Sequence, residues 1–175
     1  ILFKKSVNNI KALNFFRSVD SEVLIGKDEN SRIININVEE KPTGEVAAGA
    51  GFGTSGSTVL FSVKENNFLG KGIGFNSNFS VSTETFKGSF SLNNPNYKNS
   101  DKSIFIQAQA LETDRLADFG YKTNKTGFGL GTKFEYLRDL DLGLSSDIYL
   151  EKISTDSTAS ARQKKQAGNY LDLDR

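Results

Sequence analysis

The chain has 175 residues, with 22 Lys and Arg against 21 Asp and Glu, and this near balance gives no reason to expect a nucleic-acid partner. It contains no His and no Cys, which excludes Ser-His-Asp and Cys-His catalysis, the usual zinc sites and a disulfide framework. The mean hydropathy is -0.40, and no apolar run approaches the ~20 residues of a membrane helix. A membrane β-barrel is still compatible with these values, because its strands alternate apolar and polar residues.

Both ends of the chain predict a fragment. The sequence lacks Met altogether, position 1 included, and shows no charged segment followed by an apolar one, as a signal peptide would. Its last residues, 169–175, stop in the middle of an alternating pattern. We therefore expect a piece cut at both ends, with any signal peptide lying upstream.

Residues 1–42 predict a small α+β unit. The segment 6–17 fits a helix capped by Ser6, and its apolar residues fall on one face at three-residue spacing: Val7, Ile10, Leu13 and Phe16. Two strand-like runs follow at 22–26 and 32–39, separated by the turn-rich KDENS. A helix packed on one face of such a hairpin makes a unit of about 40 residues, which is too small to be secure alone.

From Gly44 onward, apolar residues recur with period two, which predicts β-strands. The expected strands are 45–54, 58–65, 73–82, 86–93, 103–112, 126–137 and 140–152, with an eighth beginning at Asn169. Their polar side is rich in Gly, Ser, Asn and Lys, as the wall of a water-filled lumen would be. A soluble antiparallel β-sandwich also alternates, but strands near ten residues, with both prolines in connectors, favour a transmembrane barrel.

The connectors between these strands add a second pattern. Three are compact, at 66–72, 94–102 and 138–141, whereas 112–125 and 154–169 are longer and polar. Short turns on one side and longer loops on the other are typical of transmembrane barrels. Aromatic residues near the connectors fit two interfacial girdles: Phe68, Tyr97, Phe119 and Tyr121.

Charged residues offer few candidates for chemistry. Asp139 and Asp141 share a face at a strand edge, and Asp147 lies further along it, but we interpret them as a solvated turn and a polar lumen wall rather than as an acid–base pair or calcium site. The run 39–41 (Glu-Glu-Lys) is interpreted as a soluble linker face rather than a partner site. Four lysines near predicted strand ends are expected to reach toward lipid phosphates: Lys64, Lys71, Lys87 and Lys102. No catalytic residue, metal or cofactor is expected.

Several longer strings resemble the Omp85 family of outer-membrane assembly proteins. They are VNNIKALNFFRSVD, INVEEKPTGEVAAGAGFGTSGS, ENNFLGKG and NPNY, and they occur in the family's order over nearly the whole chain. The resemblance implies that 1–42 is the C-terminal part of the last POTRA domain, with its second helix and final two strands. It implies that 43–175 is the N-terminal half of an antiparallel barrel, with about seven of sixteen strands.

The resemblance also implies a mechanism and a location. The barrel lies in the bacterial outer membrane and the POTRA part in the periplasm. Nascent barrel proteins are inserted there without nucleotide, because their terminal strand pairs with the first barrel strand at a lateral gate. The expected partners are these nascent proteins, membrane lipid and, through the POTRA domains, lipoprotein subunits and periplasmic chaperones.

The first barrel strand supplies the candidate pairing residues: Glu45, Val46, Ala47, Ala48, Gly49, Ala50, Gly51, Phe52, Gly53 and Thr54. Pro42, Thr43 and Gly44 are the implied hinge between POTRA domain and barrel. Alternation places Gly49, Gly51 and Gly53 on one face of the strand and leaves four residues for lipid: Val46, Ala48, Ala50 and Phe52. The glycines are consistent with a strand kept weak for gating, and equally with room for tight curvature or a neighbouring plug.

Three other functions fit the sequence less well. Within the family they are a TamA-like assembly factor and a two-partner secretion pore. Outside it, a passive porin-type barrel is the main alternative, although an α+β module leading straight into the first strand argues against a simple porin.

Overall fold

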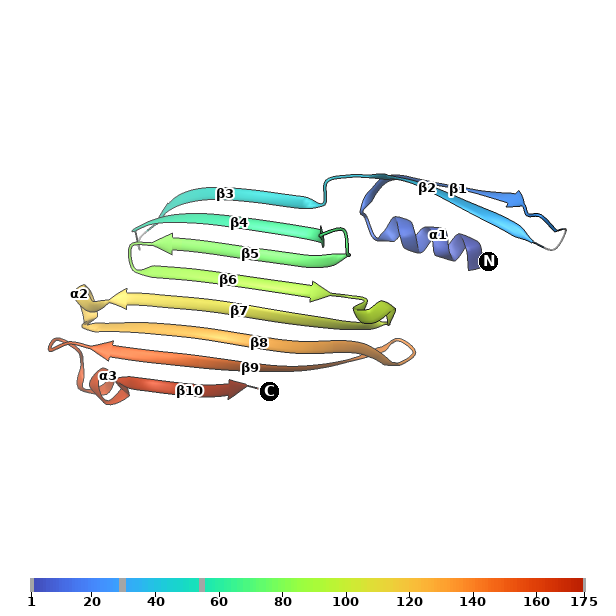
Figure 1. Ribbon diagram of the computed structural model, residues 1–175. Coiled ribbons are helices and arrows are strands. Elements are labelled where there is room, and N and C mark those ends of the chain that lie inside the picture. The colour runs from blue at the N-terminus through green and yellow to red at the C-terminus, as the bar shows by residue number, and fades with distance from the viewer. Residues whose placement is uncertain (1, 29–30, 54–55, 175) are drawn as a thin grey trace. The chain divides into compact units, whose positions relative to one another are not determined.

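The computed structural model describes residues 2–28, 31–53 and 56–174, and the chain divides into two compact units, 1–43 and 44–175. The first unit contains α1 (Leu2–Ala12) and an antiparallel pair of strands, β1 (Phe16–Ile25) and β2 (Arg32–Glu40) (Figure 1). No helix among the described residues is both long and apolar enough to cross a membrane.

The first helix lies earlier in the sequence than expected. It begins at Leu2, so that Ser6 lies inside it instead of capping it, and it ends at Ala12. Asn14 has a left-handed φ of 59°, a conformation that asparagine tolerates and that stops the helix. The predicted helical residue Phe16 instead begins β1, which starts six residues before the predicted strand 22–26 because its whole length pairs with β2. Helical spacing alone did not reveal this early helix end.

The second unit is one antiparallel sheet in which each strand pairs with the next in sequence. Its strands are β3 (Gly44–Gly53), β4 (Gly56–Phe68), β5 (Ile73–Ser82), β6 (Thr85–Asn94), β7 (Lys102–Arg115), β8 (Tyr121–Leu137), β9 (Leu140–Thr155) and β10 (Gly168–Asp174). Figure 1 shows them side by side from β3 to β10. The described residues form a single layer here, not the two packed sheets of the alternative sandwich.

Most strands match the prediction, and β5 has the predicted bounds. The predicted long loop 112–125 is wrong, because β7 continues to Arg115 and β8 begins at Tyr121, with only the short α2 (Leu116–Phe119) and Gly120 between them. Charged side chains continue the pairing there: the Lys122 Nζ lies 2.6 Å from the Glu112 carboxylate and 3.2 Å from that of Asp114. Opposite charges that face each other on neighbouring strands stabilise a sheet, so a run of charged residues does not have to end a strand.

The other connectors also differ in detail. The predicted turn 66–72 shortens to 69–72, because β4 runs on to Phe68. A short 3₁₀ helix, η1 (Tyr97–Asn99), lies between β6 and β7. The predicted loop 154–169 contains α3 (Ala161–Gln166), whose first turn is closed by a capping box between Ser160 and Gln163.

The strand register separates the residues of this sheet into two faces. One face is apolar and carries, among others, Val46, Phe61, Phe79, Phe90, Ile106, Phe128, Leu144 and Leu171. The other face carries Ser, Asn, Gln, Gly and charged residues. Buried apolar side chains among the described residues are confined to Val7, Val19 and Ala159, so the apolar face of the sheet is not covered by any part of the chain that the structure describes.

Candidate functional site

Strand β3 is an edge of the sheet. It pairs with β4 from Gly44, opposite Glu65, to Gly53, opposite Gly56, and no other described strand pairs with it. The strands that precede it in sequence, β1 and β2, pair with each other in a separate sheet. The edge of β3 that faces away from β4 therefore has backbone N–H and C=O groups that pair with no strand within the described chain. The strands β1 and β2 do not fill this edge, because they pair with each other.

The two faces of β3 are as the alternation predicts. On the apolar face, Phe52 is 90% exposed and Val46 is 69% exposed. On the polar face, the position of a Cβ on Gly49 would be 3.3 Å from Leu60, whereas Gly51 and Gly53 have no atom within 4 Å. The polar side of this strand is thus nearly bare, and Thr54, the last predicted pairing residue, lies outside the described residues.

The predicted hinge spans the boundary between the two units. Pro42 and Thr43 lie between β2 and β3, outside both strands. Gly44 is already the first residue of β3, where it faces Glu65 of β4. Its backbone therefore belongs to the sheet, so only Pro42 and Thr43 of the predicted hinge lie in the three-residue connection 41–43.

A second row of alternate glycines, which the sequence reasoning did not single out, lies on the polar face of β8. Gly127, Gly129 and Gly131 face side chains from the strands on either side. A Cβ on Gly127 would overlap the ring of Tyr149 of β9, and one on Gly131 would overlap the ring of Phe105 of β7. These glycines therefore leave room for side chains of the flanking strands to lie over β8. Their alternate spacing matches that of the β3 glycines, and this spacing is the sequence feature from which the second row could have been predicted.

At the central glycine of that row, two strands that are not neighbours are linked directly. The Gln107 amide of β7 donates a hydrogen bond of 2.7 Å to the Asp147 carboxylate of β9, across Gly129 of β8. Close by, the Lys125 Nζ lies 4.2 Å from the centre of the Tyr149 ring. Polar and aromatic side chains thus tie β7, β8 and β9 together on the polar face.

Of the three aspartates considered for catalysis or calcium, two have structural side-chain partners and the third is exposed in a turn. Asp141 forms a 2.6 Å ion pair with Lys133, and Asp147 accepts the Gln107 hydrogen bond. Asp139 lies in the turn between β8 and β9, with a φ of 62° and a side chain that is 94% exposed. Within the described residues no three acidic side chains form a group suited to a metal ion.

The predicted lipid-directed lysines divide between the faces. The register places Lys64 and Lys87 on the polar face, so their predicted snorkelling to lipid is wrong; Lys87 instead lines a hollow of about 670 Å³ whose other lining residues include Ser62 and Asn78. Lys102 does extend the apolar face at the start of β7, opposite Phe134. Period two decides the face of a strand residue, and nearness to a strand end does not override it.

The Glu-Glu-Lys run at 39–41 belongs to the first unit. Glu39 forms a 2.7 Å ion pair with Arg17 of β1, and the Lys41 Nζ donates a 2.6 Å hydrogen bond to the Asn14 side chain. The Lys41 backbone N–H donates to the Phe15 carbonyl. This run therefore closes the β1–β2 hairpin at its open end, in addition to leading out of it.

A long antiparallel sheet with one apolar and one polar face is the architecture of a β-barrel wall. Comparison with protein families and a search of curated proteins give no match. Among solved structures, the chain is similar to BamA from Haemophilus ducreyi lacking POTRA domains 1–3, with a TM-score of 0.75 and 19% sequence identity. The match covers 98% of this chain and 36% of that chain. The chain has the fold of part of BamA, the Omp85 protein that its sequence strings also resemble.

Proposed function

We propose that this chain is part of an outer-membrane protein assembly factor, which folds and inserts β-barrel proteins into the bacterial outer membrane. The observation that carries the proposal is the unpaired edge of β3 in a sheet with the BamA fold. An edge strand offers a row of backbone groups that can template an incoming strand. The site proposed for this pairing is the described part of the predicted strand, Glu45–Gly53.

An unpaired strand edge is energetically costly inside a membrane. The apolar face of the sheet is suited to lipid, and in lipid each unsatisfied backbone group costs several kcal/mol. The β3 edge must therefore be closed by a strand at rest, and exchange of that strand for a guest leaves the number of satisfied groups unchanged. The small side chains of β3 favour such exchange, because few side-chain contacts have to be broken.

We assign the first unit to the end of a POTRA domain in the periplasm. Support comes from its composition of one helix and an antiparallel strand pair, and from the sequence strings that it shares with the Omp85 family. Pro42 and Thr43, with Gly44, would set the entry of the chain into the barrel. Periplasmic chaperones and lipoprotein subunits are the partners expected for this unit, and no catalytic step, metal or cofactor is required.

Disulfide crosslinking tests the pairing site, and the 175 residues of this chain contain no Cys that would compete with the introduced one. Single cysteines replace Ala47 and Ala48 of β3 in the full-length protein, and one cysteine is placed in the terminal strand of an outer-membrane protein that is being assembled. Ser89 and Phe90 of β6 supply matched controls, one on each face of a strand that is paired on both sides. We expect crosslinks from β3 and none from β6.

A cysteine scan of Glu45–Gly53 that yields no crosslink at any register would contradict the proposed site. Equal crosslinking from β6 would show that the incoming strand does not pair selectively with the free edge of β3. A passive porin-type barrel would give no guest crosslink at all, because its first strand stays paired with another strand of the same barrel.

A further inference from the structure

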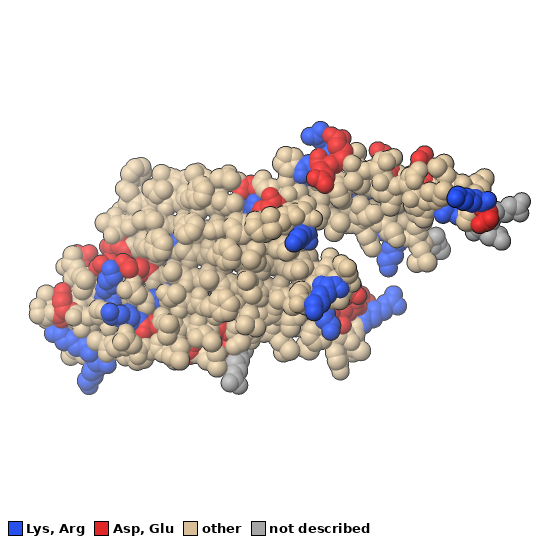
Figure 2. Space-filling view, in the orientation of Figure 1, with Lys and Arg blue, Asp and Glu red and all other residues tan. Residues whose placement is uncertain are grey.

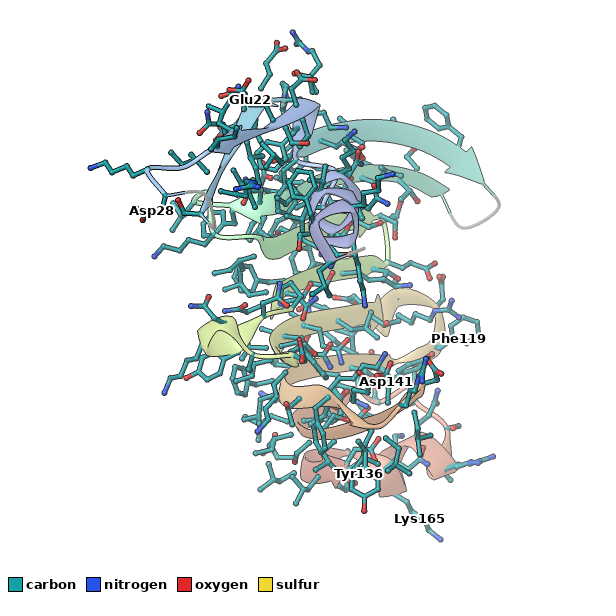
Figure 3. All side chains as sticks on the ribbon, turned by 90° about the vertical axis from the view of Figure 1, so that its right-hand side faces the viewer. Glu22, Asp28, Phe119, Tyr136, Asp141 and Lys165 are labelled. Carbon is teal, nitrogen blue, oxygen red and sulfur yellow. The ribbon has the colours of Figure 1, made fainter. Side chains whose placement is uncertain are left out.

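The hollow of about 670 Å³ that Lys87 lines extends across β4, β5, β6 and β7. Its lining residues are three successive cross-strand rows, and one outer row consists of Leu60, Ser80, Lys87 and Leu111. Both outer rows direct their side chains to the polar face, whereas the middle row, which includes Phe61, directs them to the apolar face. In Figure 3 side chains project from both sides of the sheet, and the labelled Asp141 of β9 belongs to the polar face. The hollow therefore opens on the polar face, away from the β3 edge.

The hollow combines one charge with apolar and hydrogen-bonding groups. Leu60 is 45% exposed and Leu111 is 38% exposed. In the second outer row, the Asn78 amide donates a 3.4 Å hydrogen bond to the Ser89 hydroxyl, and both residues are exposed. Lys87 is exposed too, and it forms no hydrogen bond or ion pair within the described chain. Such a surface offers a ligand a charge, two apolar contacts and side-chain hydrogen bonds.

No neighbouring acid compensates the positive charge of Lys87. Within the described chain, the register places no Asp or Glu on the polar face of β4, β5, β6 or β7. Glu112 and Asp114 of β7 lie on the opposite face, where they pair with Lys122 near the strand ends. In Figure 2 the charged side chains of the sheet gather near the strand ends, and the middle of the sheet in that view is largely uncharged. Lys87 therefore favours an anionic ligand in the hollow.

The polar face of β9 and β10 has the opposite charge. Its charged residues within the described chain are all acidic: Asp141, Asp147, Glu151, Asp172 and Asp174. Lys133 of β8 compensates Asp141, but no ion pair within the described chain compensates Glu151 or Asp172. An anion on the polar face is therefore repelled from β9 and β10 and attracted to Lys87.

The dimensions of the hollow suit an extended peptide that crosses the strands. Four neighbouring strands spaced by about 4.8 Å span about 14 Å, which is the length of roughly four extended residues at about 3.3 Å each. Alternate side chains of such a segment point the same way, so an acidic residue can face Lys87 while apolar residues two positions away contact Leu60 and Leu111. The Asn78 amide and the Ser89 hydroxyl can bond to the peptide backbone.

We propose that this hollow binds an extended acidic peptide segment, with a carboxylate of the segment on Lys87. We call this site the Lys87 hollow. It is separate from the β3 edge, because side chains select the ligand by charge in the hollow, whereas backbone groups pair at the edge. Binding in the Lys87 hollow does not require strand pairing at β3.

Calorimetric titration tests the Lys87 hollow. The full-length protein, folded in phosphatidylcholine vesicles, is titrated with acetyl-Val-Ser-Glu-Ser-Val-amide, or with the same peptide carrying Gln in place of Glu. The test variant is Lys87→Gln. The control is Lys64→Gln, which removes the same charge from the same face but outside the hollow, opposite Glu45. We expect the unmodified protein and the control to bind the acidic peptide about fivefold more tightly than the neutral one, and the test variant to bind both equally.

Three results would overturn the proposed site. If Lys87→Gln retains the preference for the acidic peptide, or Lys64→Gln loses it equally, then the hollow does not select the ligand. If the unmodified protein binds both peptides equally, then charge has no role. If it binds neither, then another part of the same protein fills the hollow or no peptide does. None of these results affects crosslinking from β3, which tests the proposed function separately.

Discussion

Two strands of one sheet carry alternate glycines on the polar face, and their surroundings are opposite. In β3, Gly51 and Gly53 face empty space, whereas in β8, Gly129 lies beneath the hydrogen bond from Gln107 to Asp147. An interior strand has neighbours on both sides whose side chains reach over it, and an edge strand has one. Glycine at alternate positions therefore allows side chains to pack closely over β8, whereas in β3 it leaves the polar face of the strand uncovered.

The largest effect expected from this comparison is on β8. Gly129→Val would place a side chain into Asp147 and Gln107, and we expect it to lower the free energy of unfolding by about 1–3 kcal/mol. Gly51→Val in β3 is the matched control, and should be neutral or stabilising by up to ~1 kcal/mol, because its site is open and valine suits a strand. Urea titration of the full chain folded in lipid vesicles measures both; equal losses would remove the distinction between the strands.

A second, smaller effect concerns the link across β8. Removing Gln107 or Asp147 leaves the other partner unsatisfied, so a double-mutant cycle of Gln107→Ala and Asp147→Ala should give a coupling energy of about 1 kcal/mol. The same cycle with Gln109→Ala in place of Gln107→Ala is the control, because no hydrogen bond joins Gln109 to Asp147 in the described chain. Additive losses in both cycles would mean that the bridge does not stabilise the strands that it spans.

The smallest effect extends the comparison to Gly120, which lies just before β8 and is covered by Asp156, Thr158 and Ala159. Hydrogen bonds from the Thr158 hydroxyl and backbone N–H hold the pKa of Asp156 below its ordinary value. A lowered pKa stabilises the folded connector above the ordinary aspartate value of about 4, and the contribution is lost as the pH falls through the lower, folded value.

Hydrogen exchange of the Thr158 amide reports on that connector. We expect protection to fall as the pH drops below about 4, after correction for the intrinsic exchange rate. Asp156→Asn should show weak protection at every pH and little further change. An unmodified chain whose protection does not vary with pH would contradict the role given to Asp156.

The sequence predicted the strands best where large apolar and small polar residues alternate, as in β5. It missed the ends of β7 and β8, because Glu112, Asp114 and Lys122 look like loop residues until the register pairs their charges. It missed α3 for a similar reason, since the cap is formed by two ordinary polar residues. The composition of a segment does not show which residue will lie opposite each of its residues on the neighbouring strand.

The candidate site was predictable in part. Alternation alone assigns Val46 and Phe52 to one face of β3 and its glycines to the other, and the structure has the same assignment. That β3 is an edge strand followed from the resemblance and not from the pattern. The covering of Gly129 depends on three strands in register, which periodicity within one strand cannot reveal.

Proline substitution in β3 tests the central claim, that the free edge of this strand pairs with an incoming strand, most directly. Successive residues of a strand direct their N–H groups to opposite edges, so one of Ala47→Pro and Ala48→Pro removes a bond to β4 and the other removes only a donor from the free edge. We predict that the second variant reaches the membrane folded and yet fails to support outer-membrane protein assembly in cells depleted of the native copy. Two variants that both fold and both sustain assembly at the normal level would contradict the account.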